Sequence, residues 1–195
     1  MPTLKFWKPY RVLTQFTDDD DGRETLADYI DVPHVYAAGR LDYDSEGLMI
    51  LTDDGDLNHQ LTHPKYGHPR TYWAQVERIP DEDALNQLRR GGIPIKNYKT
   101  RPAQADLIPE PDLPDRDPPI RYRKNVPDTW LELTLTEGKK RQVRRMTAAV
   151  GHPTLRLVRA KIGNLTLAGM QAGKYYELTP QELDMLWQSI RASRS

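Results

Sequence analysis

Two repeating patterns of apolar and polar residues divide the chain into expected strands and helices. Residues 70–78 and 130–136 alternate with a period of two, as strands with one buried face do. In the first strand, one face carries Tyr72, Ala74 and Val76. The other face carries Thr71, Trp73, Gln75 and Glu77. Residues 48–52 form an unbroken apolar run, typical of a buried strand. Shorter strands are expected at 4–7, 12–16, 155–159 and 174–178.

Helical periodicity marks five further segments, at 25–30, 56–62, 81–90, 140–150 and from Pro180 onward. Asp56 is the expected N-cap of the second helix, because an aspartate side chain accepts hydrogen bonds from the first free amides. In the fourth helix, one face carries apolar residues at positions i, i+3 and i+7. We predict that this face packs against the core through Val143, Met146 and Val150.

The strands and helices follow one another without strict alternation, so the pattern predicts an α+β fold with a mixed or antiparallel sheet. Seven prolines lie between residues 102 and 127. Since proline cannot donate to a sheet or helix, we predict that this stretch is an irregular surface excursion. We interpret it as an insertion into a single domain of residues 1–195 that has two subdomains.

Charge is segregated along the chain, although the net charge is zero. Residues 17–56 contain two basic and thirteen acidic side chains, whereas residues 121–161 contain eleven basic and three acidic ones. Such asymmetry favours a surface that binds a polyanion, but pairing of these charges across the fold explains it equally well.

No metal site is expected from the sequence. His59 and His63 have the spacing of a zinc-binding helix, but Gln60 stands where a catalytic Glu is needed, so a structural role is favoured. The acidic runs 18–21 and 53–56 lack the alternating ligands of a calcium loop and are interpreted as solvated turns. Without cysteine, a signal peptide or a long apolar run, the chain is expected in the cytoplasm.

A polar loop with a glycine at each end, Gly39 and Gly47, precedes the apolar run 48–52. A carboxylate in such a loop is held by a rigid scaffold and can face a ligand. The simpler interpretation of Asp42 is a turn or capping residue, and from this loop alone it is the better one.

Four motifs of the chain occur together in one order: Lys8-Pro9, Gly39-Arg40-Leu41-Asp42, Arg70-Thr71-Tyr72, and the run 137–146 with the sequence EGKKRQVRRM. In these motifs the chain resembles the RNA pseudouridine synthases, in particular the branch that modifies single sites of ribosomal RNA. Ser45 and Arg70 replace the more common Thr and Lys. The resemblance implies the pseudouridine synthase fold, with a central active-site cleft. Most members of this branch begin with an S4-type RNA-binding domain, but here Leu4 already begins the catalytic fold, so we expect no such domain.

The resemblance also implies the roles of three residues. Asp42 is the expected catalytic carboxylate, Arg144 its ion-pair partner, and Tyr72 the ring that stacks on the target uracil. An adjacent guanidinium keeps a carboxylate ionised, which agrees with the pairing. Taken alone, Tyr72 is better interpreted as a core residue of its strand. The reaction requires no metal or organic cofactor.

Further residues are expected to contact RNA. Arg40 matches the family residue that enters the space left by the flipped nucleotide, although a salt bridge to Asp44 or Glu46 is the alternative. Ile162 has two interpretations: it forms an apolar wall beneath the base, or it is an ordinary core residue. Phosphate contacts are expected from four residues that are otherwise solvated helix charges: Lys139, Lys140, Arg141 and Arg145.

The expected partner is therefore large-subunit ribosomal RNA, and the expected state is a monomer. Two other functions are open: a non-catalytic RNA-binding or ribosome-assembly module, and a glycoside-processing enzyme with Asp42 and Asp44 as paired carboxylates. The basic segment disfavours a neutral sugar substrate.

Overall fold

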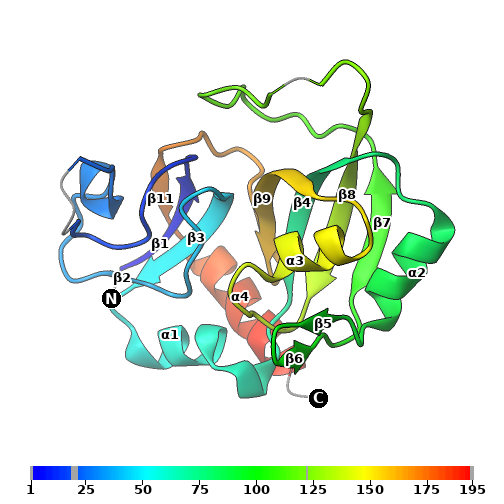
Figure 1. Ribbon diagram of the computed structural model, residues 1–195. Helices are drawn as coiled ribbons and strands as arrows, with labels where there is room; N and C mark the ends of the chain where they lie inside the picture. Colours follow the sequence, from blue (N-terminus) through cyan, green and yellow to red (C-terminus); the bar gives the residue numbers. More distant parts are fainter. Residues whose placement is uncertain (1, 19–21, 122, 194–195) are drawn as a thin grey trace. The chain divides into compact units, whose positions relative to one another are not determined.

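The computed structural model describes residues 2–18, 22–121 and 123–193. The chain divides into two compact units (Figure 1). The first contains residues 1–68 and 159–195, and the second contains residues 69–158. The strand β9 (Thr154–Ile162) begins in the second unit and ends in the first.

A sheet forms the centre of the first unit. β1 (Thr3–Lys8) lies between β11 (Tyr175–Glu177) and β3 (Glu46–Thr52), and β3 is followed by the end of β9. The β1–β3 and β1–β11 pairs are antiparallel. Two short strands extend this sheet: β2 (Tyr36–Ala37) pairs with β3, and β10 (Leu165–Thr166) pairs with β9. Every residue of β3 is buried, as its unbroken apolar run predicts.

Helices in the first unit are α1 (Gly55–Thr62) and α4 (Pro180–Ala192), with 3-10 turns η1 (Leu26–Asp28) and η2 (Pro64–Tyr66). The side chain of Asp54 caps α1 by accepting from the amides of Asp56 and Leu57 at 2.9 and 3.0 Å. The prediction that Asp56 is the cap was wrong, because the helix begins one residue earlier, at Gly55. The helix predicted at 25–30 is the single turn η1.

The second unit has a sheet in which β8 (Asp128–Leu135) pairs with β4 (Arg70–Glu77) and with β7 (Gln104–Ile108), both antiparallel. The helices α2 (Glu82–Arg90) and α3 (Gln142–Ala149) and a small hairpin of β5 (Pro94–Ile95) and β6 (Tyr98–Lys99) complete it.

One hydrophobic cluster holds this second unit together. It includes Ala74 and Val76 from β4, Leu88 from α2, and Val143 and Met146 from α3. Both helices therefore cover the same face of the sheet. The alternation predicted for residues 70–78 and the core face predicted for α3 are confirmed, and the antiparallel pairings confirm the α+β class.

The strand predicted at 12–16 is absent from the structure. Arg11 has a φ of 59°, so the chain turns away after Tyr10, and Val12 makes a single bridge with Glu24. Val12 and Thr14 are nevertheless buried. Leu13 and Phe16 are only partly buried, and the amide of Leu13 donates to the carbonyl of Glu24 in a loop.

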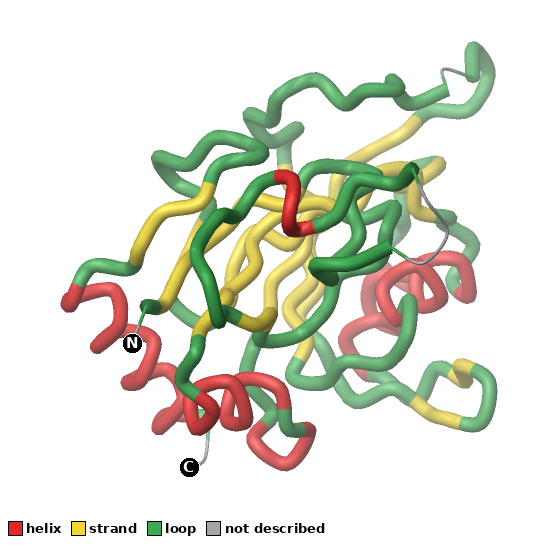
Figure 2. The backbone as a smooth tube through the Cα atoms, turned by 90° about the vertical axis from the view of Figure 1, so that its left-hand side faces the viewer, coloured by secondary structure: helices red, strands yellow, loops and turns green. Residues whose placement is uncertain are grey.

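The proline-rich stretch 102–127 was predicted to contain no regular structure, which is wrong for its first part. β7 occupies Gln104–Ile108, where no proline occurs. From residue 109 to residue 127 the described chain has neither helix nor strand, and Figures 1 and 2 show it as a long loop that joins β7 to β8. No helix among the described residues is long and apolar enough to cross a membrane.

Candidate active site

Asp42 begins a β-turn in the loop that joins β2 to β3. Its carbonyl oxygen accepts from the amide of Ser45 at 3.0 Å, which closes the turn. On either side of Asp42, the carbonyl of Leu41 accepts from the Thr14 hydroxyl at 3.2 Å, and that of Tyr43 accepts from the Arg11 amide at 2.9 Å. The backbone around Asp42 is thus held by the residues that follow β1.

The end of β3 next to this loop requires a glycine. Gly47 has a φ of 112°, and a Cβ atom there would lie 2.4 Å from the carbonyl oxygen of Arg159. No real Cβ atom lies so close to another atom. The close approach of β3 to β9 therefore requires a glycine at position 47. Arg159 is itself buried, and its Nε donates to the carbonyl of Leu48 at 2.7 Å.

Lys8 at the end of β1 is fully buried, and its ammonium lies beneath the same loop. The Nζ atom donates to the carbonyl of Pro9 at 2.8 Å and to that of Tyr43 at 3.5 Å. Burial lowers the pKa of Lys8 from 10.5 to about 7, against the opposing effect of three nearby carboxylates. In decreasing order of effect they belong to Glu46, Asp44 and Asp42.

Arg40, two residues before Asp42, is exposed. Its Nη2 donates to the side chain of Gln15 at 3.5 Å. Among the residues that the structure describes, it forms no ion pair with Asp44 or Glu46, so that alternative is not observed. An exposed guanidinium beside the Asp42 turn can reach a nucleic acid.

Tyr72 lies in β4 of the second unit, opposite Leu133 of β8. Its side chain is partly buried and packs against the hydrophobic cluster that contains Val143 and Met146 of α3. The ring therefore has one side supported by the core, as a stacking platform requires, and the packing is equally that of a strand tyrosine.

The segment before α3 is organised by a buried carboxylate, that of Glu137. Its Oε1 accepts from the amide of Arg101 at 2.8 Å and from the side-chain amide of Gln142 at 2.6 Å, and its Oε2 accepts from the Tyr98 hydroxyl. Gln142 in turn accepts from the amide of Lys139 at 2.9 Å. These bonds link the two ends of the segment 137–142 to each other, and Glu137 links the segment to β6 and to the loop that follows it.

The predicted phosphate-binding residues belong to this segment and to α3. Lys139 and Lys140 are exposed, while Arg141 and Arg145 are partly buried. The ammonium of Lys139 lies 4.4 Å from the centre of the Tyr98 ring, an arrangement that favours a cation. Arg141, with a φ of 55°, is the N-cap residue of α3, which starts at Gln142 and not at about residue 140 as predicted.

Arg144 is partly buried in α3, next to the helix face that packs on the core. Its Nη1 donates to the carbonyl of Thr154 at 3.4 Å, and its own carbonyl accepts from the Thr147 hydroxyl at 3.2 Å. Its guanidinium is thus tied to the start of β9. Ile162, at the end of β9, is buried, with 3% of its surface exposed.

Other predicted features lie in the first unit. The imidazole rings of His59 and His63 have centres 4.8 Å apart and both contact the Tyr66 ring. The run 53–56 supplies the cap of α1, as described above. Of the run 18–21, only Asp18 lies within the described residues, and its carboxylate pairs with Arg23 at 2.6 Å.

The chain matches the model of the RNA pseudouridylate synthase family over residues 4–149. It belongs to this family. The chain is therefore an enzyme that isomerises uridine to pseudouridine in RNA, and the fold and family expected from the four motifs are confirmed.

Relatives and a solved structure support the same conclusion. The chain is 55% identical to the ribosomal large subunit pseudouridine synthase E of Vibrio parahaemolyticus, over 89% of this chain and 72% of that protein. It is 57% identical to the synthase of the same name from Xanthomonas axonopodis, over 82% and 85%. A crystal structure of a pseudouridylate synthase superposes with a TM-score of 0.78 at 28% identity, covering 95% of this chain and 73% of the other.

Two groups in the site were not predicted from the sequence. Lys8 and Glu137 were noticed only as members of motifs, and Glu137 also as one of three acidic residues in a basic region, but no role was predicted for either. Glu137 is the only acidic residue between Glu132 and Glu177, which is a signal that sequence analysis can use, whereas Lys8 lies between two other basic residues, Lys5 and Arg11, and gives no such signal.

Proposed function

We propose that this enzyme isomerises a uridine of large-subunit ribosomal RNA, with Asp42 as the catalytic carboxylate. The observation that carries the proposal is the β-turn at Asp42, whose backbone is held on both sides and whose flanking residues match the family loop. The names of the similar proteins from Vibrio and Xanthomonas support the choice of ribosomal RNA. The cytoplasm, where ribosomal RNA is modified in bacteria, is the corresponding location.

In the proposed reaction, the bond between N1 of the uracil and C1′ of the ribose breaks, the base turns, and a bond forms between C5 and C1′. The C5 proton is released and N1 gains a proton, so atoms and charge balance without a redox step. Asp42 acts as a nucleophile or as an anion that stabilises positive charge at the sugar. Arg144 keeps Asp42 ionised as its pair, and Tyr72 stacks on the base.

RNA binding in this proposal depends on the exposed basic groups. Arg40 occupies the space that the flipped uridine leaves, since eversion costs a few kcal/mol of lost stacking. Lys139, Lys140, Arg141 and Arg145 contact phosphates, and Ile162 contributes an apolar wall near the base. Both lysines and Arg40 present their charges to solvent, which supports their proposed contacts with RNA.

The test is release of tritium from large-subunit ribosomal RNA transcribed with C5-tritiated uridine. We expect Asp42→Asn to lower the rate at least about 1000-fold, as loss of a reacting group commonly does. Asp44→Asn is the matched control, because it removes the same charge from the same turn, and it should retain most activity. Near-normal release by Asp42→Asn would refute the assignment.

The same assay tests the substrate. Transcripts of the large subunit should release tritium, and transcripts of the small subunit should not. Tight binding of large-subunit RNA by the unaltered protein without any release would instead favour a non-catalytic module on this fold. Mapping the new pseudouridine would identify the target position.

A further inference from the structure

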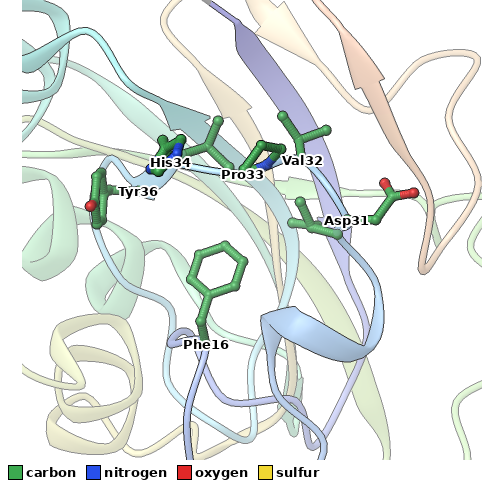
Figure 3. Close-up of a pocket in the computed structure, with 8 residues that line it drawn as sticks. Phe16, Asp31, Val32, Pro33, His34 and Tyr36 are labelled. Carbon is green, nitrogen blue, oxygen red and sulfur yellow. The ribbon is translucent and has the colours of Figure 1, made fainter.

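The first unit has a surface hollow, formed by Phe16 and the segment 30–36, with a volume of about 370 Å³. Most of its lining side chains are apolar. Figure 3 shows the Phe16 ring directed toward this segment, with Tyr36 at one end of the row and Asp31 at the other. The Tyr36 side chain is 65% exposed, an unusual value for an aromatic residue in a strand.

The backbone holds these apolar side chains at the surface. Ile30 and Val35 are buried and anchor the segment at both ends. Between them His34 has a φ of 63°, a conformation that a residue with a side chain adopts only when its surroundings impose it. Between the same anchors Pro33 is exposed and Val32 is partly buried. A fixed apolar surface of this kind is typical of a contact with another molecule.

The surroundings of the hollow are acidic. Asp31 lines the hollow, and the described residues 22–36 contain three acidic side chains and one basic one, Arg23, which pairs with Asp18. The three carboxylates accept hydrogen bonds from uncharged donors: Asp31 from the Tyr175 hydroxyl, Glu24 from the Tyr29 hydroxyl at 2.7 Å, and Asp28 from the Thr25 amide at 2.7 Å. Neutral donors leave the negative charge of each carboxylate in place.

These carboxylates shift the pKa values of two neighbouring tyrosines, Tyr29 and Tyr175. Burial, with the adjacent Glu24 carboxylate, raises the pKa of Tyr29 to about 12. The hydrogen bond to Asp31 raises the pKa of Tyr175. A negative environment repels phosphates, so it disfavours RNA as the occupant and favours a cationic one.

We propose that the hollow binds a lysine- and arginine-rich polypeptide segment that inserts an aliphatic or prolyl side chain between Phe16 and Tyr36. The cationic side chains of the segment lie beside Asp31 and its acidic neighbours. Binding of this kind combines an apolar anchor with steering by opposite charge. The inference concerns a protein partner, so it is independent of the catalytic assignment of Asp42.

The experiment is fluorescence anisotropy with four labelled probes of equal length. The first is a peptide of repeated Lys-Pro-Leu-Arg, the second has Glu in place of Lys and Arg, the third has Ser in place of Pro and Leu, and the fourth is a single-stranded RNA. The first probe should bind at least about 10-fold more tightly than the second and the third. Its binding should weaken as NaCl rises from about 50 to about 300 mM.

Variants locate the binding. Tyr36→Ala should weaken the first probe about 10-fold, and Asp31→Asn about 3-fold, whereas Ile79→Ala should not change it. Ile79 is the matched control, because it is another exposed apolar residue, 63% accessible, in the second unit. Val32→Arg is a second variant that places a positive charge in the hollow, and melting curves check that each variant is folded.

Three results overturn the proposal. The first is equal binding of the first and second probes, and the second is an equal loss of binding in Ile79→Ala and Tyr36→Ala. The third is that the RNA probe binds more tightly than the first peptide and that Tyr36→Ala weakens this RNA binding. Tritium release from protein-free RNA should be unchanged in Tyr36→Ala. A loss of that activity shows that the hollow serves RNA, and it also overturns the proposal.

Discussion

The acidic loop 42–46 and the basic segment 139–145 are each built around a buried residue of the opposite charge. Beneath the acidic loop, the Lys8 ammonium donates to the carbonyls of Pro9 and Tyr43. Behind the basic segment, the Glu137 carboxylate accepts from Arg101, Gln142 and Tyr98.

The two regions differ in how well the buried charge is satisfied. Glu137 accepts three hydrogen bonds, as a buried carboxylate requires. Lys8 donates to two carbonyls, one of them at 3.5 Å, and its burial lowers its pKa to about 7. The comparison shows that the basic segment is held by a complete hydrogen-bond network, whereas the acidic loop depends on a group that titrates near neutral pH.

The strongest test of the comparison removes the guanidinium from α3. Arg144→Leu should lower the rate of tritium release at least about 1000-fold, because Asp42 loses the proposed partner that keeps it ionised. Arg145→Leu is the matched control and should have a much smaller effect, mainly on KM. Normal turnover by Arg144→Leu contradicts the proposed pair.

The second prediction concerns the aromatic ring of the second unit. Tyr72→Ala should lower kcat/KM by about 5- to 150-fold, which corresponds to about 1–3 kcal/mol of stacking on one base. Tyr72→Phe keeps the ring and should retain most of the activity. If the two variants are equally active, the stacking role is wrong, and circular dichroism melting separates this outcome from a loss of fold.

The third prediction removes the buried carboxylate. In Glu137→Leu, the Arg101 amide, the Gln142 amide group and the Tyr98 hydroxyl lose their acceptor, so the free energy of unfolding should fall by about 2–3 kcal/mol. Urea denaturation measures this change. Glu110→Leu, at an exposed position of the long loop, is the control and should leave the stability within about 0.5 kcal/mol.

The smallest predicted effect is a pH dependence that Lys8 imposes. Because its folded pKa of about 7 lies below its unfolded value of 10.5, the unfolded chain binds more protons between these limits. Burial of the protonated Lys8 ammonium therefore lowers the free energy of unfolding below pH 7. This cost decreases as the pH rises and Lys8 loses its proton in the folded state. The free energy of unfolding should gain about 1 kcal/mol from Lys8 between about pH 7 and about pH 8.

Lys8→Met tests this sign. Urea denaturation at the two pH values should show a smaller gain in the variant than in the unaltered protein, because the methionine does not titrate. An identical gain in both proteins would mean that other groups cause the pH dependence.

Most of the regular elements could be predicted from local patterns, since β3, β4, β8, α2 and the core face of α3 follow from short-range periodicity. β7 was missed because it lies in a proline-rich stretch, although its own five residues contain no proline. The segment 12–16 was mistaken for a strand because its apolar residues resemble a strand pattern, but they have no strand partner. Hydrogen-bond partners that are distant in the sequence decide such cases, and periodicity contains no information about them.

The amino-acid sequence by itself determined the family, because four short motifs in a fixed order are properties of the chain and need no coordinates. It also determined which residues are candidates for the chemistry: Asp42, Tyr72 and Arg144. Only the tertiary structure decided that Lys8 and Glu137 are buried, that Gly47 lies against Arg159, and that Tyr36 is exposed beside an apolar hollow. The physical reason is that burial and close approach depend on segments far apart in the chain, and burial changes what a charged group costs and does.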